Sequence, residues 1–242
     1  MLTYAIHALG YRPEDGITRP LNGSLKAIVK FDTEESVFCV YSEIVAARLG
    51  QTLHLPVATG VLVPVGAGLA FASLRVAAPG VALPNLSYRQ LARVAAIYAD
   101  EAAGLVAFDV WIGNSDRAQN IKASLNPHVH LFSGFDHSHA LLGLETSPDA
   151  SIGRLVSHDP IVSHHPFQGL IRTEMLDRWL GRIEELPVAY IAACCRFSRP
   201  IGLVSEQMQE ELELALVARR NNLRAILGAK YRGLSRKIPT GA

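Results

Sequence analysis

The most informative run of residues is Phe108-Asp-Val-Trp-Ile-Gly-Asn-Ser-Asp-Arg-Ala-Gln-Asn-Ile-Lys122, followed a hairpin later by Gly134-Phe-Asp-His-Ser138. The apolar start of this run predicts a buried helix, so Asp116 and Asn120 are expected in the loop that follows it. Two β-rich runs, Asn120 to Leu125 and Val129 to Phe135, predict the strands of the hairpin, with Asn126-Pro127-His128 as its turn. Asp136 is then expected at the end of the second strand.

Three oxygen-bearing side chains in this block point to phosphate chemistry. Magnesium favours carboxylate and amide oxygens and takes few of them from protein, and Asp116, Asn120 and Asp136 offer such a set. Phosphoryl transfer needs magnesium on the phosphates and a carboxylate that orients the attacking hydroxyl, with little covalent help from the protein. An acidic loop followed by a second aspartate across a hairpin can supply both.

The chain before this block is predicted to be rich in strands. Short β-rich runs separated by glycine, proline and charged residues predict strands at Leu25 to Phe31, Val57 to Val65 and Leu69 to Leu74. Apolar positions at helical spacing predict one helix from about Glu34 to Leu49, with Gly50 as its stop.

A break divides this strand-rich part from a helical part. The segment from Val76 to Ser87 contains Pro79, Gly80, Pro84 and Asn85 and cannot continue a strand, so we expect a hinge there. Beyond it, Tyr88 to Trp111 predicts a buried helix or helix pair, and helical patterns resume from Arg172. The predicted fold is α+β, with a small strand-rich lobe at residues 1–85 and a larger helical lobe at residues 86–242.

The loop and the hairpin resemble the catalytic and metal-binding motifs of HipA-like kinases, which are similar in this region to phosphatidylinositol kinases. The resemblance rests on Asn114-x-Asp-Arg-x-x-Asn120 and on the Phe-Asp-His turn. It implies that Asp116 is the catalytic base, that Asn120 is a metal ligand, and that Asp136 is the metal-binding aspartate that protein kinases hold in Asp-Phe-Gly.

The resemblance extends to the strand-rich part. Gly23-Ser24, after Arg19-Pro20, is similar to the family's short phosphate loop, whose backbone N–H groups cover the phosphates. Ala27-Ile-Val-Lys30 is similar to the strand that carries the ATP-binding lysine. Ser42-Glu-Ile-Val-Ala-Ala-Arg-Leu-Gly50, followed by Leu55-Pro-Val57, is similar to the helix whose glutamate, here Glu43, faces that lysine.

The resemblance therefore implies a bilobal, protein-kinase-like fold that binds ATP and magnesium between its lobes. The implied activity is transfer of phosphate to a hydroxyl acceptor, with Ser or Thr of a protein as the expected substrate. The last helix, Leu216 to Leu227 with Arg219-Arg220, also resembles the family's C-terminal element.

One departure from the family pattern supports an alternative. The metal-binding asparagine usually lies five residues after the base, whereas Asn120 lies four after Asp116, and Ala118 stands where a histidine is common. A shorter loop can move the amide away from the metal, so a nucleotide-binding pseudokinase that serves as an interaction module is the first alternative.

The histidines and cysteines could support other chemistry. A metal-dependent hydrolase is the second alternative, because five histidines lie close together in sequence: His137, His139, His158, His164 and His165. None shows the helical His-x-x-x-His spacing or a paired cysteine motif. Cys39, Cys194 and Cys195 form neither a disulfide framework nor a zinc spacing, which predicts a reducing, cytoplasmic location. Cys194 and Cys195 are expected to be buried helix residues rather than nucleophiles, because no His or Asp is near them in sequence.

Composition limits the class of partner. With 23 basic and 22 acidic residues, the formal net charge of +1 gives no overall field for nucleic acid or an anionic membrane. No stretch approaches the roughly 20 apolar residues of a membrane span. The basic segment from Ala218 to Lys237 is interpreted as a solvated helix face with a frayed tail rather than as a nucleic-acid site. No feature of the sequence specifies an oligomeric state.

Overall fold

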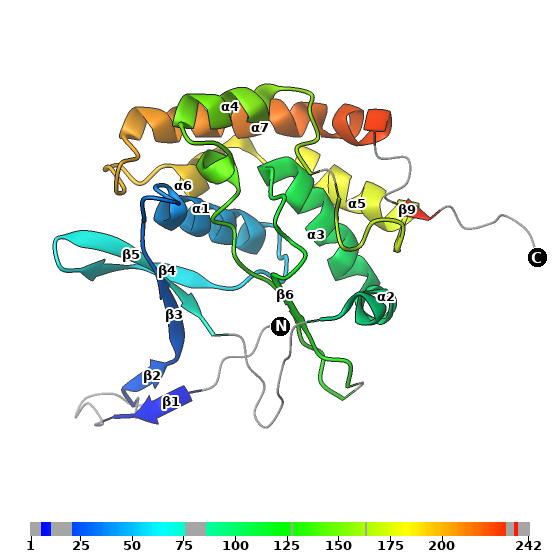
Figure 1. Cartoon of the computed structure of the whole chain (residues 1–242), viewed down its shortest axis with the longest axis horizontal. Coiled ribbons are helices and arrows are strands. Elements are labelled where there is room, and N and C mark those ends of the chain that lie inside the picture. Colours follow the sequence, from blue (N-terminus) through cyan, green and yellow to red (C-terminus); the bar gives the residue numbers. More distant parts are fainter. Residues whose placement is uncertain are drawn as a thin grey trace, which may run out of the picture.

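The computed structural model describes residues 6–10, 21–75, 86–126, 128–162, 164–230 and 235–236 (Figure 1). Strands come first and helices follow, which is the α+β order expected from the sequence. The elements are β1 (Ile6–Leu9), β2 (Gly23–Leu25), β3 (Ala27–Lys30), α1 (Cys39–Thr52), β4 (Gly60–Val65), β5 (Gly68–Leu74), α2 (Tyr88–Ile97), α3 (Ala99–Ile112), β6 (Ile121–Ala123), β7 (Phe132–Gly134), the 3-10 helix η1 (Leu141–Leu144), α4 (Pro148–Val156), β8 (Ile171–Arg172), α5 (Thr173–Glu184), α6 (Val188–Cys195), α7 (Glu206–Lys230) and β9 (Ser235–Arg236).

The strand-rich part contains an antiparallel sheet of order β3-β5-β4. Lys30 and Leu62 both pair with Phe71 on the central strand, so these three side chains share one face of the sheet. Helix α1 packs against β4 and β5, and Phe71 on that face belongs to the hydrophobic core. The sheet therefore turns Lys30 towards the side on which α1 lies.

Helix α1 begins later than the sequence predicts. Residues from Glu34 were expected to be helical, but Thr33 and Ser36 form a tight turn with two backbone hydrogen bonds of 3.2 and 3.1 Å. Asp32 Oδ1 accepts a hydrogen bond of 2.8 Å from the backbone N–H of Val40, in the first turn of α1. A carboxylate at the positive end of a helix satisfies a free donor, and this contact stabilises the start at Cys39.

The predicted helical region from Tyr88 to Trp111 is a pair of helices, α2 and α3, that break at Tyr98. The Tyr98 hydroxyl donates to the carbonyl of Ser124 at 2.8 Å and accepts from the N–H of Leu131 at 3.1 Å. The break thus anchors the β6-β7 hairpin to the helices. Helix α3 is buried along most of its length, and a methyl group on Gly104 would lie 2.5 Å from a Leu55 side-chain carbon.

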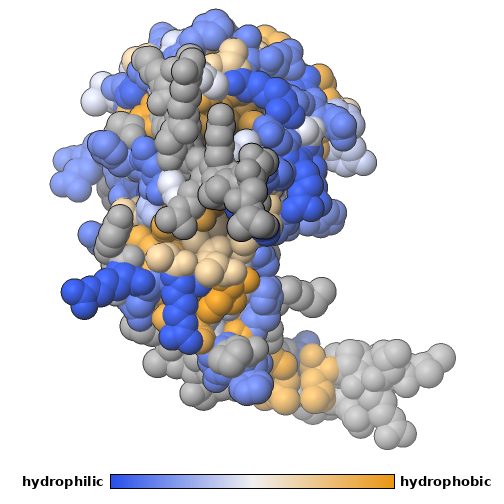
Figure 2. Space-filling model, turned by 90° about the vertical axis from the view of Figure 1, so that its right-hand side faces the viewer, coloured by the Kyte–Doolittle hydropathy of each residue, from blue (hydrophilic) through white to orange (hydrophobic). Residues whose placement is uncertain are grey.

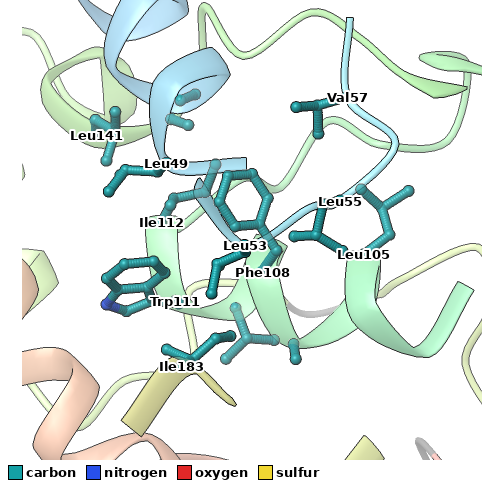
Figure 3. Packing of buried hydrophobic residues seen from close by; sticks show 14 of the residues in the cluster. Leu49, Leu53, Leu55, Val57, Leu105, Phe108, Trp111, Ile112, Leu141 and Ile183 are labelled. Carbon is teal, nitrogen blue, oxygen red and sulfur yellow. The ribbon is translucent and has the colours of Figure 1, made fainter. Parts of the chain in front are cut away.

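One hydrophobic core connects the strand-rich part to the helical part. Figure 3 shows Leu49 of α1 and Leu53, which directly follows that helix, packed beside Phe108 and Trp111 of α3, with Ile183 of α5 below them. Because α1 contributes to this core, it is held by the helical part as well as by the sheet. Two further contacts join α1 to the helical part. The Tyr41 hydroxyl donates to the carbonyl of Cys195 at 2.9 Å, and the Arg48 guanidinium lies 4.2 Å from the centre of the Phe197 ring.

The surface differs between the two parts. Apolar residues in Figure 2 gather in the lower half of the face, whereas the upper half, over the helical part, is mainly hydrophilic. Exposed large apolar residues of the strand-rich part are Ile6, Leu9, Leu21, Leu25, Ile28, Val29, Phe31, Val61 and Val65. Among the helices that the structure describes, none combines the length and the apolar character of a membrane span.

Some expectations need correction or fall outside the described residues. The segment that carries the five histidines contains η1 and α4. Arg219 is buried rather than solvated, and donates to the carbonyls of Val110, Leu155 and three further residues. The hinge and the boundary at residue 85 lie almost wholly in residues 76–85, which are outside the described part of the chain. Arg19-Pro20 and most of the basic tail beyond Lys230 are outside it as well.

Candidate active site

Three side chains from distant parts of the sequence meet around one ammonium group. Lys30 Nζ, at the end of β3, lies 2.5 Å from Glu43 Oε1 on α1 and 2.8 Å from Asp136 Oδ1 in the turn after β7. Glu43 is buried, whereas Lys30 and Asp136 are partly exposed. The sequence singled out all three residues, and the structure brings them together.

The charges of this cluster stabilise one another. Burial lowers the pKa of Lys30, but the carboxylates of Glu43 and Asp136 outweigh this effect and raise it above its usual value. Burial raises the pKa of Glu43, but His137 and Lys30 lower it more. Burial likewise opposes ionisation of Asp136, yet Lys30 and Ser138 bring the pKa of that carboxyl down to about 2. All three groups are therefore ionised at neutral pH.

Asp136 is held in an uncommon backbone conformation. Its φ of 58° lies in the left-handed region, which a few per cent of non-glycine residues occupy, with Asp among the better tolerated. Ser138 Oγ donates to Asp136 Oδ1 at 2.8 Å, and Lys30 binds the same oxygen. These contacts hold the carboxylate on the side of the Lys30 ammonium, and within the described residues its other oxygen, Oδ2, makes no hydrogen bond or ion pair.

Asp116 and Asn120 lie together in the loop between α3 and β6. Helix α3 ends at Gly113, whose φ of 75° is the left-handed conformation that glycine adopts without strain. Asn120 Nδ2 donates to the carbonyl oxygen of Asp116 at 2.6 Å and lies 3.3 Å from its carboxylate Oδ2. The short spacing therefore still joins the two side chains.

The amide orientation leaves an oxygen for another use. Because Nδ2 of Asn120 is directed at Asp116, its Oδ1 points elsewhere, and it accepts no hydrogen bond from the residues that the structure describes. The backbone of Asn120 is fixed as well, because its carbonyl accepts from the N–H of Phe135 at 3.1 Å. That bond joins the acidic loop to the residue just before Asp136.

A buried ion pair lies beneath both loops. Arg117 Nε and Nη2 donate to Asp109 Oδ2 and Oδ1, each at 2.8 Å, in a two-pronged contact with both side chains fully enclosed. Arg117 Nη1 donates to the carbonyls of Phe135 at 2.6 Å and Asn120 at 3.1 Å. One guanidinium thus holds the backbone of the acidic loop and of the Asp136 turn on the end of α3.

Two further residues complete the support of Asp109. Asn114 Nδ2 donates to Asp109 Oδ1 at 3.1 Å, and His165 Nε2 lies 3.1 Å from Oδ2. Because His165 Nδ1 accepts from the N–H of Phe167, its proton lies on Nε2, which donates to Asp109. Burial opposes the charge of Asp109, but Arg117 and then His165 hold the pKa of that carboxyl far below its usual range.

Sequence reasoning missed most of this support. Asp109 and Arg117 were not among the expected site residues, and His165 was considered only as one of the five histidines of a possible metal site. The available signal was a charged residue, Asp109, inside the apolar run from Phe108 to Ile112, since buried carboxylates require partners. The identity of those partners depends on tertiary contacts that spacing does not reveal.

Gly23 and Ser24, which the resemblance places in a phosphate loop, lie at the start of β2. This strand pairs with β1, and both residues are exposed. Their role in covering phosphates stays a prediction. No contact joins them to Lys30 within the described residues.

The histidines belong to separate networks. His137 lies against Glu43 and His165 against Asp109, while His139, His158 and His164 are exposed. Among the described residues, no group of three or more His, Cys, Asp or Glu side chains is placed to hold a metal ion. The hydrolase alternative thus finds no shared histidine site in this part of the chain. Cys194 and Cys195 are buried in α6, as expected, and Cys39 is also a buried thiol.

No family model matches the sequence, and no curated protein matches it. Solved structures do match. The chain aligns with the Helicobacter pylori proinflammatory kinase CtkA at a TM-score of 0.62 and 16% identity, over 97% of this chain and 98% of that one. It aligns with HipA of Shewanella oneidensis MR-1, solved with HipB and operator DNA, at a TM-score of 0.55 and 17% identity.

The second alignment covers 95% of this chain and 65% of the Shewanella chain, so this chain spans about two thirds of that protein's length. At these identities the likeness concerns the fold. The expected fold is confirmed: a small strand-rich region followed by a helical part, arranged as in the HipA-like kinases.

Proposed function

We propose that this protein is an ATP- and magnesium-dependent phosphotransferase that acts on a hydroxyl group, with Ser or Thr of a protein as acceptor. The observation that carries the proposal is the bridge of Lys30 to Glu43 and Asp136. Protein kinases require a strand lysine paired with a helix glutamate, and an aspartate that holds magnesium. The fold shared with two kinases supports the same assignment.

The residues present fit a magnesium ion. Asp136 is a partly exposed, ionised carboxylate, and the amide oxygen of Asn120 is left open by the orientation of the side chain. Both are the hard oxygen donors that magnesium prefers, and the ion takes only one or two protein carboxylates in nucleotide sites. When held by Asp136 and Asn120, magnesium would neutralise charge that develops on the phosphates during transfer.

The other residues have separate tasks. Lys30, once ATP is present, would bind phosphate oxygens while Glu43 keeps it in place. Asp116 is exposed, so its carboxylate can reach an acceptor hydroxyl and take its proton as a general base. The bond from Asn120 to the carbonyl of Asp116 keeps that carboxylate near the metal-binding oxygens. Arg117 holds both loops in one arrangement.

Removal of the Lys30 ammonium is expected to weaken ATP binding. Lys30→Ala should raise the Kd for ATP by about 10- to 100-fold, the range that one hydrogen bond to a charged group supplies. Isothermal titration calorimetry with magnesium measures this. Lys26→Ala, at an exposed lysine directly before β3, is the matched control and should bind like the wild type. Unchanged affinity in Lys30→Ala would make Lys30 a surface-strand lysine.

The metal ligands are tested by a magnesium titration of ATP binding. Asp136→Ala should abolish the dependence of ATP affinity on magnesium, because the carboxylate that would bridge ion and protein is gone. Asn120→Ala should raise the magnesium concentration needed for half-maximal effect, because only the amide oxygen is lost. Normal magnesium dependence in Asp136→Ala would contradict the kinase assignment.

The short spacing between Asp116 and Asn120 supports a second candidate, a pseudokinase that binds nucleotide and presents a surface to a partner. Asn120→Ala separates the two candidates: a magnesium response like that of the wild type favours the pseudokinase. Incubation with labelled ATP, magnesium and cell extract tests the acceptor class. Labelled Ser or Thr of a protein supports the proposal, and tight ATP binding with no labelled product and no hydrolysis supports the pseudokinase.

A further inference from the structure

His137 lies between the metal-binding turn and helix α1. It directly follows Asp136, and its ring is buried with its edge towards Phe108, the ring centroids 6.1 Å apart at an angle of 81°. Its Nδ1 lies 3.5 Å from Glu43 Oε2. Its backbone is fixed by the N–H of Ala140, which donates to the His137 carbonyl at 3.0 Å. The ring is therefore directed at Glu43 by both packing and backbone.

Glu43 has one partner for each carboxylate oxygen. Lys30 binds Oε1 at 2.5 Å, and His137 is the neighbour of Oε2. Glu43 is only 2% exposed, so water cannot take the place of either partner at low cost. A carboxylate held at one oxygen can rotate about its terminal bond, whereas contacts at both oxygens fix its plane.

At 3.5 Å, the contact between His137 Nδ1 and Glu43 Oε2 is longer than an ordinary N–H···O hydrogen bond. The other ring nitrogen, Nε2, is buried and has no hydrogen-bond partner among the described residues. Nδ1 is accordingly the nitrogen through which the ring makes a polar contact, and Glu43 is the group that it reaches.

We propose that His137 is a positioning residue for phosphoryl transfer: its Nδ1–H holds Oε2 of Glu43, fixing the glutamate that orients Lys30 and tying the Asp136 turn to α1. The proposal rests on the kinase function proposed above. His137 touches neither phosphate nor acceptor and acts through Glu43. Its neighbour Asp136 has a φ of 58°, and a conformation of this kind persists when surrounding contacts determine it. Two contacts hold this turn: the His137 side chain, next to Asp136 in sequence, contacts Glu43, and Lys30 binds the Asp136 carboxylate.

Three substitutions separate a donor at Nδ1 from mere packing. His137→Asn keeps an amide group at the position of Nδ1, His137→Gln places its amide near the position of Nε2, and His137→Phe keeps the ring without a donor. Steady-state phosphoryl transfer from magnesium-ATP gives kcat and KM for each. His158→Phe, at an exposed histidine remote from Glu43 in sequence, is the matched control.

We expect kcat/KM to fall by about 10- to 100-fold in His137→Phe and His137→Gln, the range of one hydrogen bond to a charged group. His137→Asn should stay within about threefold of the wild type, because its amide restores the donor. His158→Phe should not change. A wild-type rate in His137→Phe, or equal losses in all three His137 variants, would overturn the proposal.

A second measurement is independent of transfer, so that it decides even if the kinase function fails. Urea denaturation of wild type, Glu43→Gln, His137→Phe and the double variant gives a double-mutant cycle. We expect the two substitutions to be non-additive, with a coupling of about threefold or more in the unfolding equilibrium constant. Additive effects would show that His137 does not hold Glu43. Coupling without any transfer by the wild type would refute the kinase function and retain the contact.

Discussion

Replacement of Arg117 by methionine is expected to lower the free energy of unfolding by about 3–5 kcal/mol, because it leaves a buried carboxylate without its cation. Asp109 and Arg117 are both fully enclosed, and the guanidinium makes four hydrogen bonds, two to the carboxylate and two to loop carbonyls. Methionine fills similar space but can donate to none of these acceptors. Urea denaturation measures the loss directly.

The effect of this substitution should depend on pH. In the wild type, Arg117 keeps the pKa of Asp109 below its unfolded value, so the pair stabilises the fold above that value. Without Arg117, we expect burial to raise the pKa of Asp109 above its unfolded value. The penalty on the variant then grows as pH rises from the unfolded value to the raised value, and is complete above it. The deficit should therefore be largest at neutral pH and shrink as pH falls.

Arg178→Met provides the control for stability. Arg178 makes an exposed ion pair with Asp100 at 3.1 Å, and such pairs contribute about 0–1 kcal/mol. If Arg117→Met loses no more unfolding free energy than Arg178→Met, the buried pair of Arg117 and Asp109 does not hold the two loops in place. If the loss of unfolding free energy in Arg117→Met is equal at low and neutral pH, the buried charge of Asp109 is not its cause.

Asp116→Asn is expected to lower kcat for phosphoryl transfer by about 10²- to 10⁴-fold, the contribution of a general base. The substitution keeps the size of the side chain. Its amide oxygen can still accept a hydrogen bond from Asn120 Nδ2, which lies 3.3 Å from Asp116 Oδ2 in the wild type. ATP affinity should be unchanged, because Asp116 is not among the groups proposed to bind phosphate or metal.

Single-turnover transfer and calorimetric ATP binding on the same preparation separate chemistry from binding for this variant. Asp100→Asn, at an exposed aspartate of α3, serves as the matched control and should have the wild-type rate. If Asp116→Asn transfers phosphate as fast as the wild type, another group accepts the proton. If its ATP affinity falls together with kcat, Asp116 contributes to the nucleotide site.

The order of motifs predicted the cluster around Lys30 because each motif is local. A β-rich run carries Lys30, a helical pattern carries Glu43, and a hairpin carries Asp136, so only their meeting point required the fold. The helical spacing of apolar residues also predicted the helices on either side of Tyr98. The later start of α1 was not, because a helical pattern beginning at Glu34 did not reveal that Thr33 and Ser36 close a turn.

The support beneath the loops could not be predicted because it joins residues by tertiary contacts alone. Asp109 and His165 are far apart in sequence, and their hydrogen bond depends on how α3 packs against the segment after α4. The burial of Arg219 has the same origin, since its carbonyl partners come from the end of α3 and from α4 and the segment after it. A run of basic residues predicts exposure to solvent, and the sequence alone does not show which of these residues becomes buried by packing.

The most direct test of the central claim is transfer of the γ-phosphate of ATP, followed with labelled nucleotide at saturating magnesium. The wild type is expected to label a hydroxyl acceptor, and Asp136→Ala to label none under the same conditions, although both are folded by circular dichroism. Equal labelling by the wild type and Asp136→Ala would contradict the account, because the bridge from Lys30 to Asp136 would then have no part in the chemistry.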